Sequence, residues 1–292
     1  MAVPTDPAGG RPFSLVVVSG KGGTGKTCVA ASMLCLHPEA LGVDADVEAP
    51  NLCLMLGAEY RECDLVRVLR PVVDPDRCDR CGLCARACRF GALLCLGAGP
   101  VRVLEDLCHG CGLCARVCPR GAIREEPVPV GERRLAAAGR LSCLEGRLFL
   151  GEPNPIPVLE ATLAAAESFG RPLVVDGPPG NACPLVATLR HGDFAVLVTE
   201  PTPFGVSDLE STLEVVQDLG IPAGILVNRA GMGSEDLTPT SERYQVPILG
   251  YLPYSDQVAQ GYARGQLPLD ADPRWEPVLT HLWQVARKEV AP

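Results

Sequence analysis

Short apolar runs separated by longer mixed segments recur along most of the chain, a pattern typical of alternating strands and helices. The run Leu-Val-Val-Val at 15–18 is typical of a buried strand, and an apolar-periodic stretch at 28–36 predicts a helix directly after it. Further strands are expected at 41–43, 173–175, 194–198, 223–227 and 246–252, and further helices at 204–219 and 276–288. This alternation predicts an α/β fold with a mostly parallel sheet flanked by helices, whose ligands lie at the carboxyl ends of the strands.

A glycine-rich loop joins the first predicted strand to the first predicted helix, the order that a P-loop requires. Its glycines let backbone amides converge on phosphate oxygens, and the helix N-terminus adds the positive end of its dipole. Lys26 would reach the β- and γ-phosphates, and the Thr27 hydroxyl would bind Mg²⁺. The expected nucleotide-binding residues here are Gly20, Lys21, Gly22, Gly23, Thr24, Gly25, Lys26, Thr27 and Cys28.

A second lysine at the start of this loop narrows the class further. The run Lys-Gly-Gly-Thr-Gly-Lys-Thr at 21–27 resembles the deviant Walker motif of MinD-like ATPases, a group that includes the nitrogenase iron protein, ParA-type partition ATPases and Mrp-type iron–sulfur carriers. The resemblance implies ATP hydrolysis by a homodimer joined through its nucleotide face. Lys21 would contact the phosphates of the other subunit and stabilise charge in the transition state. The alternative is that Lys21 is a solvated loop residue.

Four later segments are similar to further motifs of that family. Asp44-Ala45-Asp46 follows a short strand as the first switch does, so that Asp46 would orient the attacking water or a Mg²⁺-bound water, with Asp44 supporting it. Asp176 ends an apolar strand before Gly-Pro-Pro-Gly, as in a Walker B segment holding Mg²⁺ through water, although those residues alone also fit a tight turn. Asn228 would read the adenine edge, and 249–253 would close over the base. The resemblance thus implies Lys21, Lys26 and Asp46 as the catalytic residues.

The fifteen cysteines include an internal repeat. Two blocks with the spacing Cys-x₂-Cys-x₂-Cys-x₃-Cys lie thirty residues apart and resemble bacterial two-cluster ferredoxins, in which the fourth cysteine of each block binds the other [4Fe–4S] cluster. The expected ligand sets are Cys78, Cys81, Cys84 and Cys118 for the first cluster, and Cys88, Cys108, Cys111 and Cys114 for the second. The first block has Arg89 where the second has Pro119, a position that binds no iron. Zinc is the alternative metal, but its sites usually show two separated cysteine pairs with a long spacer.

The cysteine repeat divides the nucleotide-binding pattern in two. We expect residues 1–70 and 128–292 to form one discontinuous P-loop ATPase domain, interrupted by a small α+β ferredoxin-like domain at 71–127. Prolines at both borders, in 71–75 and 127–129, are typical of semi-rigid joints. Residues 131–151 are expected to form a hairpin.

Charge and hydropathy restrict the partners. The net charge is −9, which disfavours nucleic-acid binding, and no apolar run approaches the roughly 20 residues of a membrane span. Residues 1–11 have no apolar core of the kind found in an export signal, so the sequence indicates a cytoplasmic protein. The apolar face of the last helix is expected to pack in the core rather than on a membrane, because its polar face is not strongly basic.

Three functions fit these motifs. The first is an ATPase whose dimeric switch is coupled to electron transfer through two [4Fe–4S] clusters, and full coordination by eight cysteines favours it. The second is a carrier or assembly factor for iron–sulfur clusters or metal. The third is a MinD- or ParA-like spatial regulator or partner-binding switch with a redox-sensing ferredoxin module. The redox or client protein is not identified by any of them.

The remaining cysteines are expected to be mostly small buried residues. Cys183 is the exception, because it follows the second switch, where the family places its dimer interface. It would either pack at a helix start or join a dimer-bridging cluster, with Cys143 as a guess for the second ligand. The other members of this group are Cys28, Cys35, Cys53, Cys63 and Cys95.

Overall fold

The computed structural model describes residues 12–96 and 99–290. Residues 1–11, which were expected to carry no export signal, lie outside the described residues. The chain forms two compact units. Unit 1 takes in Met1–Cys63, Arg133–Arg147 and Leu159–Pro292, and unit 2 takes in Asp64–Glu132 and Leu148–Val158. Within the described ranges no helix is long and apolar enough to span a membrane.

Nine of the described strands pair in one sheet, in the order β11-β10-β9-β1-β8-β2-β7-β6-β3. Neighbouring strands from β11 to β7 run parallel. The predicted strands are confirmed: they are β1 (Ser14–Ser19), β2 (Leu41–Asp44), β8 (Leu173–Pro179), β9 (Phe194–Thr199), β10 (Ala223–Ala230) and β11 (Ile248–Pro253). The central strands β1, β8 and β9 are almost wholly buried, which explains their continuous apolar runs.

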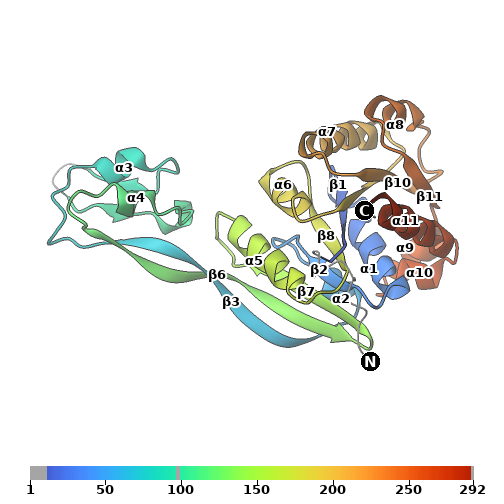
Figure 1. Ribbon diagram of the computed structural model, residues 1–292, viewed down its shortest axis with the longest axis horizontal. Helices are drawn as coiled ribbons and strands as arrows, with labels where there is room; N and C mark the ends of the chain where they lie inside the picture. Colours follow the sequence, from blue (N-terminus) through green and yellow to red (C-terminus); the bar gives the residue numbers. More distant parts are fainter. Residues whose placement is uncertain (1–11, 97–98, 291–292) are drawn as a thin grey trace. The chain divides into compact units, whose positions relative to one another are not determined.

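The helices of unit 1 fall into two contacting groups around this sheet (Figure 1). One group contains α1 (Lys26–Leu36), α2 (Leu52–Met55), α9 (Asp256–Tyr262), α10 (Pro268–Ala271) and α11 (Trp275–Val290). The other contains α6 (Cys183–Leu189), α7 (Pro203–Leu219) and α8 (Thr238–Tyr244), and α5 (Ile156–Glu167) precedes β8.

The last helix packs in the core, as its apolar face predicts. Leu279, Leu282 and Ala286 of α11 are fully buried and belong to one cluster with α1 and with strand residues such as Leu15 and Val174. Burying side chains of this size stabilises a fold by roughly 1.5–3 kcal/mol each. The face considered for membrane binding is therefore occupied by the protein itself.

Three strands complete the sheet, and two of them are unusually long: β3 (Glu59–Val73), β6 (Ile123–Ala138) and β7 (Leu141–Leu148). The hairpin expected at 131–151 is confirmed, because β6 and β7 are neighbours joined at Gly139, whose φ of 57° suits a tight turn. The proline segments at 71–75 and 127–129 differ from the expected joints. Pro71 lies within β3, and Pro127 and Pro129 lie within β6.

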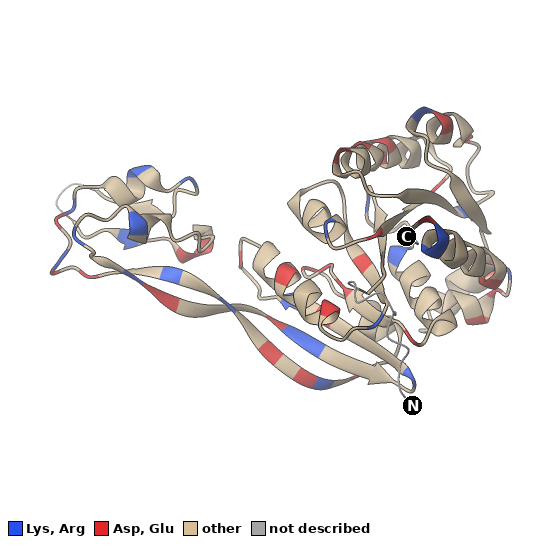
Figure 2. Ribbon diagram, viewed as in Figure 1, with Lys and Arg blue, Asp and Glu red and all other residues tan. Residues whose placement is uncertain are grey.

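Acidic and basic residues are interspersed with other residues along β3 and β6 (Figure 2). Long strands of this composition were not predicted, because charges interrupt the apolar pattern. Most of β3 is exposed, so that its sequence carries little of the alternation that marks a half-buried strand.

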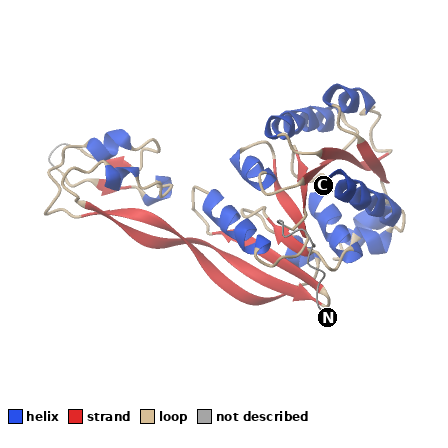
Figure 3. Ribbon diagram, in the orientation of Figure 1, coloured by secondary structure: helices blue, strands red, loops and turns tan. Residues whose placement is uncertain are grey.

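Unit 2 also contains short elements, namely α3 (Leu83–Ala87), α4 (Leu113–Arg116), β4 (Leu93–Leu94), β5 (Arg102–Val103) and the 3₁₀ helix η1 (Glu105–Leu107) (Figure 3). The sequence repeat is also a structural repeat. Gly82 and Gly112 precede the two helices with φ of 72° and 73°, and the helices contact each other. A small core of Cys84, Leu93, Val101, Cys114 and Ile123 holds the unit together.

Candidate functional site

The glycine loop begins at Ser19, where β1 ends, and leads into α1 at Lys26. Its conformation depends on glycine at two positions, since Gly23 and Gly25 have φ of 80° and 97°. The Ser19 hydroxyl donates a hydrogen bond to the Lys21 carbonyl at 2.6 Å, which fixes the first turn. At Gly20 a Cβ would lie 2.2 Å from the Asp208 carbonyl oxygen of α7, so that only glycine fits there.

A cavity of about 1320 Å³, including the part open to solvent, lies along this loop. It lies at the carboxyl ends of the parallel strands, as expected for an α/β sheet. Its lining consists of Gly22, Gly23, Gly25, Lys26, Thr27, Cys28, Asp46, Asn51, Met55, Pro179, Asn228, Arg229, Pro253, Tyr254, Ser255, Val258, Ala259, Tyr262 and Trp275.

Most of the residues expected to bind nucleotide line this cavity, but four site residues do not. Gly20 packs against α7, and Thr24 is buried in the loop. Lys21 pairs with Glu200, which does not line the cavity, and Asp176 is buried and not part of the lining. Burial raises the pKa of the lining Cys28 thiol to about 11, with Asp176 contributing, so this thiol is protonated at neutral pH.

Two of the predicted carboxylates lie side by side in the sheet, because Asp44 of β2 is in register with Asp176 of β8. Asp44 Oδ2 accepts hydrogen bonds from the backbone N–H groups of Asn51 and Leu52, at 2.7 and 2.8 Å, and its Oδ1 accepts one from the Asp46 N–H at 3.1 Å. Asp44 therefore orders the segment that carries Asp46 and the start of α2. Burial raises the pKa of this carboxyl, and the backbone donors oppose the rise.

Asp176 has the properties of a buried cation ligand. Its pKa is raised to about 7 by burial, although the hydrogen bond with the Thr27 hydroxyl and the charge of Lys26 both lower it. Its Oδ1 atom is buried and has no hydrogen-bond partner among the described residues. An unpaired buried carboxylate oxygen beside a hydroxyl is a donor set that suits Mg²⁺, which prefers oxygen ligands.

Asp46 is half-buried at the rim of the cavity. Burial raises its pKa, whereas the charge of Lys26 and a hydrogen bond from the Ala49 backbone lower it. Lys26 itself is 7% exposed, so one buried cation faces both Asp46 and Asp176. A polyphosphate bound here would therefore need a further cation, such as Mg²⁺, besides Lys26 to balance the charge of the site.

Asn228, at the end of β10, holds the loop in place. Its Nδ2 donates to the Thr24 carbonyl at 2.7 Å, and its Oδ1 accepts from the Arg229 backbone N–H at 2.9 Å. The amide is 6% exposed, with Nδ2 within 2.4 Å of the place where a Cβ on Gly25 would lie. The structure thus uses both ends of this amide inside the chain, while the residue still lines the cavity.

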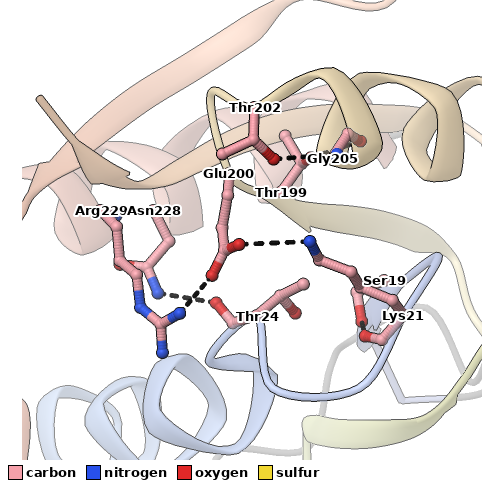
Figure 4. A network of polar contacts seen from close by, with 9 residues as sticks. All are labelled: Ser19, Lys21, Thr24, Thr199, Glu200, Thr202, Gly205, Asn228 and Arg229. Atoms are coloured by element: carbon pink, nitrogen blue, oxygen red, sulfur yellow. Dashed lines mark hydrogen bonds and ion pairs between the residues drawn. The ribbon is translucent and has the colours of Figure 1, made fainter. Parts of the chain in front are cut away.

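Lys21 forms an ion pair within its own chain, with Nζ 3.3 Å from Oε2 of Glu200 (Figure 4). The other oxygen of Glu200 accepts a hydrogen bond from Nη1 of Arg229. Neither Glu200 nor Arg229 was identified from the sequence, because each is a single charged residue at or just after the end of a strand. Tyr254, Tyr262 and Trp275 also went unrecognised, since no motif marks them and only the fold brings them to the cavity.

The eight repeat cysteines gather around two cavities in unit 2, each of about 320 Å³ including the part open to solvent. Four of them line each cavity, and the fourth member comes from the other block. The first set is Cys78, Cys81, Cys84 and Cys118, and the second is Cys88, Cys108, Cys111 and Cys114. Each cavity is lined by one of the two sets that the resemblance to two-cluster ferredoxins implies, and their role as cluster ligands stays a prediction.

Equivalent hydrogen bonds to sulfur occur in the two cysteine blocks. The Ala92 N–H donates to Cys88 Sγ and the Ala122 N–H donates to Cys118 Sγ, both at 3.3 Å. Donors of this kind favour the thiolate form and tune a bound cluster. In the described part of the chain, no three His, Cys, Asp or Glu side chains converge closely enough to hold a single metal ion.

The other cysteines are less buried than expected. Only Cys53 and Cys143 are buried, whereas Cys63 and Cys183 are exposed. Cys183 is the first residue of α6 but does not pack there. The guess that Cys143 joins it in a shared cluster is wrong, because Cys143 is fully buried in β7 and has a raised pKa caused by that burial.

The parallel sheet, the glycine loop and the charged cavity define a P-loop nucleotide-binding protein of the α/β class. A family model described as the CobQ/CobB/MinD/ParA nucleotide binding domain matches residues 15–269. The chain therefore belongs to this family. Proteins of the MinD and ParA families are generally ATPases.

Two relatives from Methanocaldococcus jannaschii are similar over most of the chain. An uncharacterized protein, MJ0578, is 30% identical over 277 residues, which cover 93% of this chain and 95% of the relative. An uncharacterized ATP-binding protein, MJ0547, is 24% identical over 260 residues, covering 87% of this chain and 78% of the relative.

Solved structures show the same fold. The septum site-determining protein MinD of Pyrococcus horikoshii, complexed with Mg-ADP, has a TM-score of 0.58 at 18% identity, covering 94% of this chain and 96% of its own. A ParA family ATPase from Chlorobium tepidum has a TM-score of 0.58 at 16% identity, covering 92% and 97%. These likenesses show the fold alone, and they do not show the clusters expected from the cysteine repeat.

Proposed function

We propose that the protein is an ATP-dependent dimeric switch that binds a partner protein and carries a redox-sensing module in unit 2. The observation that carries this proposal is the cavity over the glycine loop, where Lys26 and Thr27 lie beside Asp46 and the buried Asp176. ATP is the expected ligand because the loop amides, the start of α1 and Lys26 together favour a polyphosphate. The ATP-binding relative and the Mg-ADP-bound MinD structure support this choice.

Each residue of the site has a role in this proposal. The backbone of 22–27 and Lys26 bind the phosphates, while Thr27, Asp46 and Asp176 hold Mg²⁺ directly or through water. The ion neutralises phosphate charge when it is bound. Asp46 also orients the attacking water, and Asp44 keeps the Asp46 backbone in place through its hydrogen bonds. Asn228 fixes the loop and, at the edge of the cavity, reads the base.

Unit 2 is proposed to be an inserted ferredoxin-type domain, with the nucleotide domain formed by the chain on either side. The grouping of the eight cysteines in two exchanged sets of four supports two [4Fe–4S] clusters. The clusters would supply one-electron redox chemistry when bound. The cysteines hold them, and the paired Ala92 and Ala122 donors stabilise the sulfur charge.

ATP-gated electron transfer remains the second candidate. It is favoured by the closed ligand sets, since eight internal cysteines leave no open coordination position for handing a cluster to another protein. The carrier alternative needs such a position, and Cys183 is the one exposed cysteine near the second switch. The burial of Cys143 removes it as a second ligand beside Cys183, which makes the carrier the weakest of the three functions.

The nucleotide part of the proposal is tested by mass measurement in solution. Anaerobically prepared protein is expected to form a dimer with a non-hydrolysable ATP analogue and Mg²⁺, and to remain monomeric with ADP. Lys26→Ala should abolish nucleotide binding and the dimer, whereas the matched variant Lys288→Ala, in the last helix, should leave both unchanged. A wild-type chain that binds no nucleotide would refute this part.

The cluster part is tested by iron counting and EPR on the same material. Wild-type protein should contain about eight irons per chain. Because the sets are exchanged, Cys78→Ser and Cys118→Ser should alter the same cluster signal, and Cys88→Ser should alter the other. Cys95→Ser, which replaces an adjacent cysteine outside both sets, is the control. Colourless protein that holds zinc would contradict this assignment.

A further inference from the structure

Glu200 has no role in the proposed mechanism, yet it lies at the junction of three parts of the site. It follows β9, the strand next to β1, and its carboxylate lies between Lys21 of the glycine loop and Arg229 near the end of β10 (Figure 4). One oxygen faces each cation. The Glu200 side chain is 13% exposed, whereas those of Lys21 and Arg229 are 32% and 45% exposed.

The backbone around Glu200 is rigid. The Thr202 side chain accepts a hydrogen bond from the Gly205 N–H at 3.0 Å and so caps α7, while the Thr202 N–H donates to the Glu200 carbonyl at 2.8 Å. At Gly205 a Cβ would come within 2.2 Å of that carbonyl. Glu200 is therefore held in place by the start of α7.

The two cations differ in what else they do. By the resemblance to the deviant Walker motif, Lys21 would contact the nucleotide of the other subunit. The hydrogen bond from Ser19 fixes only the backbone of Lys21. Arg229 lines the nucleotide cavity and has an uncommon left-handed backbone, with φ of 53°. If Lys21 moves away, Arg229 still neutralises Glu200, so the mostly buried carboxylate is not left unpaired. Loss of both cations would destabilise the protein, because the mostly buried carboxylate would then be an unpaired charge.

We propose that Glu200 is a positioning residue that holds Lys21 on its own subunit in the resting state. Lys21 must leave Glu200 before it can reach a nucleotide on the second subunit, and Arg229 keeps the carboxylate paired during that exchange. The second half of this inference rests on the proposed dimeric function. Glu200 thereby sets how readily ATP closes the dimer.

The chain offers a direct test, because it contains only three lysines, namely Lys21, Lys26 and Lys288. An amine tied to a carboxylate reacts slowly with an acylating reagent. Mass spectrometry after brief treatment of the nucleotide-free protein with acetic anhydride gives the acetylation of Lys21 relative to Lys288. Glu200→Gln should raise this ratio up to about fivefold, the range of a partly exposed ion pair.

Controls separate this effect from damage to the fold. Glu210→Gln removes a carboxylate of α7 that contacts Arg243 and should leave the ratio unchanged. Glu200→Asp keeps the charge but shortens the side chain, so it should raise the ratio while retaining the pair with Arg229. A ratio that stays at the wild-type value in both Glu200 variants overturns the proposal.

The second readout is the concentration of a non-hydrolysable ATP analogue that gives half-maximal dimer. Glu200→Gln should lower it by a factor similar to the rise in Lys21 reactivity, with ADP affinity unchanged. Dimerisation equal to or weaker than wild type would refute the gating role. If no variant dimerises but Lys21 still becomes more reactive, the ion pair stands and the dimeric function fails, so the two failures are distinguishable.

Discussion

Three glycines of the phosphate loop provide a graded test of how the loop is built. Gly22 does not have a positive φ and has open space around its Cβ position. Gly23 has φ of 80° with open space, and Gly25 has φ of 97° with Asn228 Nδ2 within 2.4 Å of its Cβ position. Alanine at Gly22 therefore adds no strain, and alanine at Gly23 adds backbone strain alone. Alanine at Gly25 adds backbone strain together with a steric clash.

The expected magnitudes follow from these differences. Gly22→Ala should leave the free energy of unfolding almost unchanged. Gly23→Ala should lower it by about 1–2 kcal/mol, the cost of a left-handed conformation for an L-residue. Gly25→Ala should lower it by a further 1–3 kcal/mol or so, because the clash displaces Asn228 and leaves its buried amide or the Thr24 carbonyl without a partner.

Urea unfolding followed by tryptophan fluorescence measures these values in unit 1, since both tryptophans, Trp275 and Trp283, belong to its core. In a double-mutant cycle, Asn228→Ala should recover part of the loss in Gly25→Ala, because the clash disappears. If Gly25→Ala is no more destabilising than Gly23→Ala, Asn228 does not hold the loop as described.

Three further predictions concern other parts of the chain. Asp176→Asn should remove the dependence of nucleotide affinity on Mg²⁺ while leaving Mg²⁺-free binding, and a calorimetric titration that shows an unchanged Mg²⁺ effect would exclude Asp176 as a ligand. Although burial lowers the pKa of His191, contacts with Glu160 and Glu167 raise it overall. Its contribution is therefore complete below about pH 6.5 and lost as pH rises through the folded pKa, so His191→Gln should lower the free energy of unfolding by up to about 1 kcal/mol near pH 6 and by less at pH 8.5. Cys183→Ser should leave iron content per chain unchanged, and a loss of iron would revive a shared cluster.

The strands and the glycine loop were predictable because burial imposes a continuous apolar pattern on them. Leu15–Val18 could hardly be anything other than a central strand, and the loop after it depends on local residues alone. The long strand β3 was not predictable, since residues such as Glu59, Arg61 and Asp64 break that pattern. Its pairing partners come from residues far along the chain, and the sequence carries no local signal of that pairing.

The functional sites also contain residues that the sequence marks locally and residues that only the fold brings together. The cysteine sets were expected from the resemblance of the repeat to two-cluster ferredoxins, and in the structure each set lines one cavity. By contrast, Glu200 and Arg229 are brought to Lys21 only by the order of β9, β1 and β10 in the sheet. Asn228 illustrates the limit most clearly, because a residue expected at the base is also bound to the loop carbonyl of Thr24.

The claim on which the account depends is that nucleotide state and redox state influence each other in one chain. The decisive measurement is the reduction potential of the clusters, followed by EPR in anaerobic protein with Mg-ADP and with a Mg-bound, non-hydrolysable ATP analogue. Reciprocal coupling of only fivefold corresponds to a shift of about 40 mV for a one-electron couple. The account predicts a shift of at least this size that is absent in Lys26→Ala. Identical potentials in both nucleotide states would contradict it.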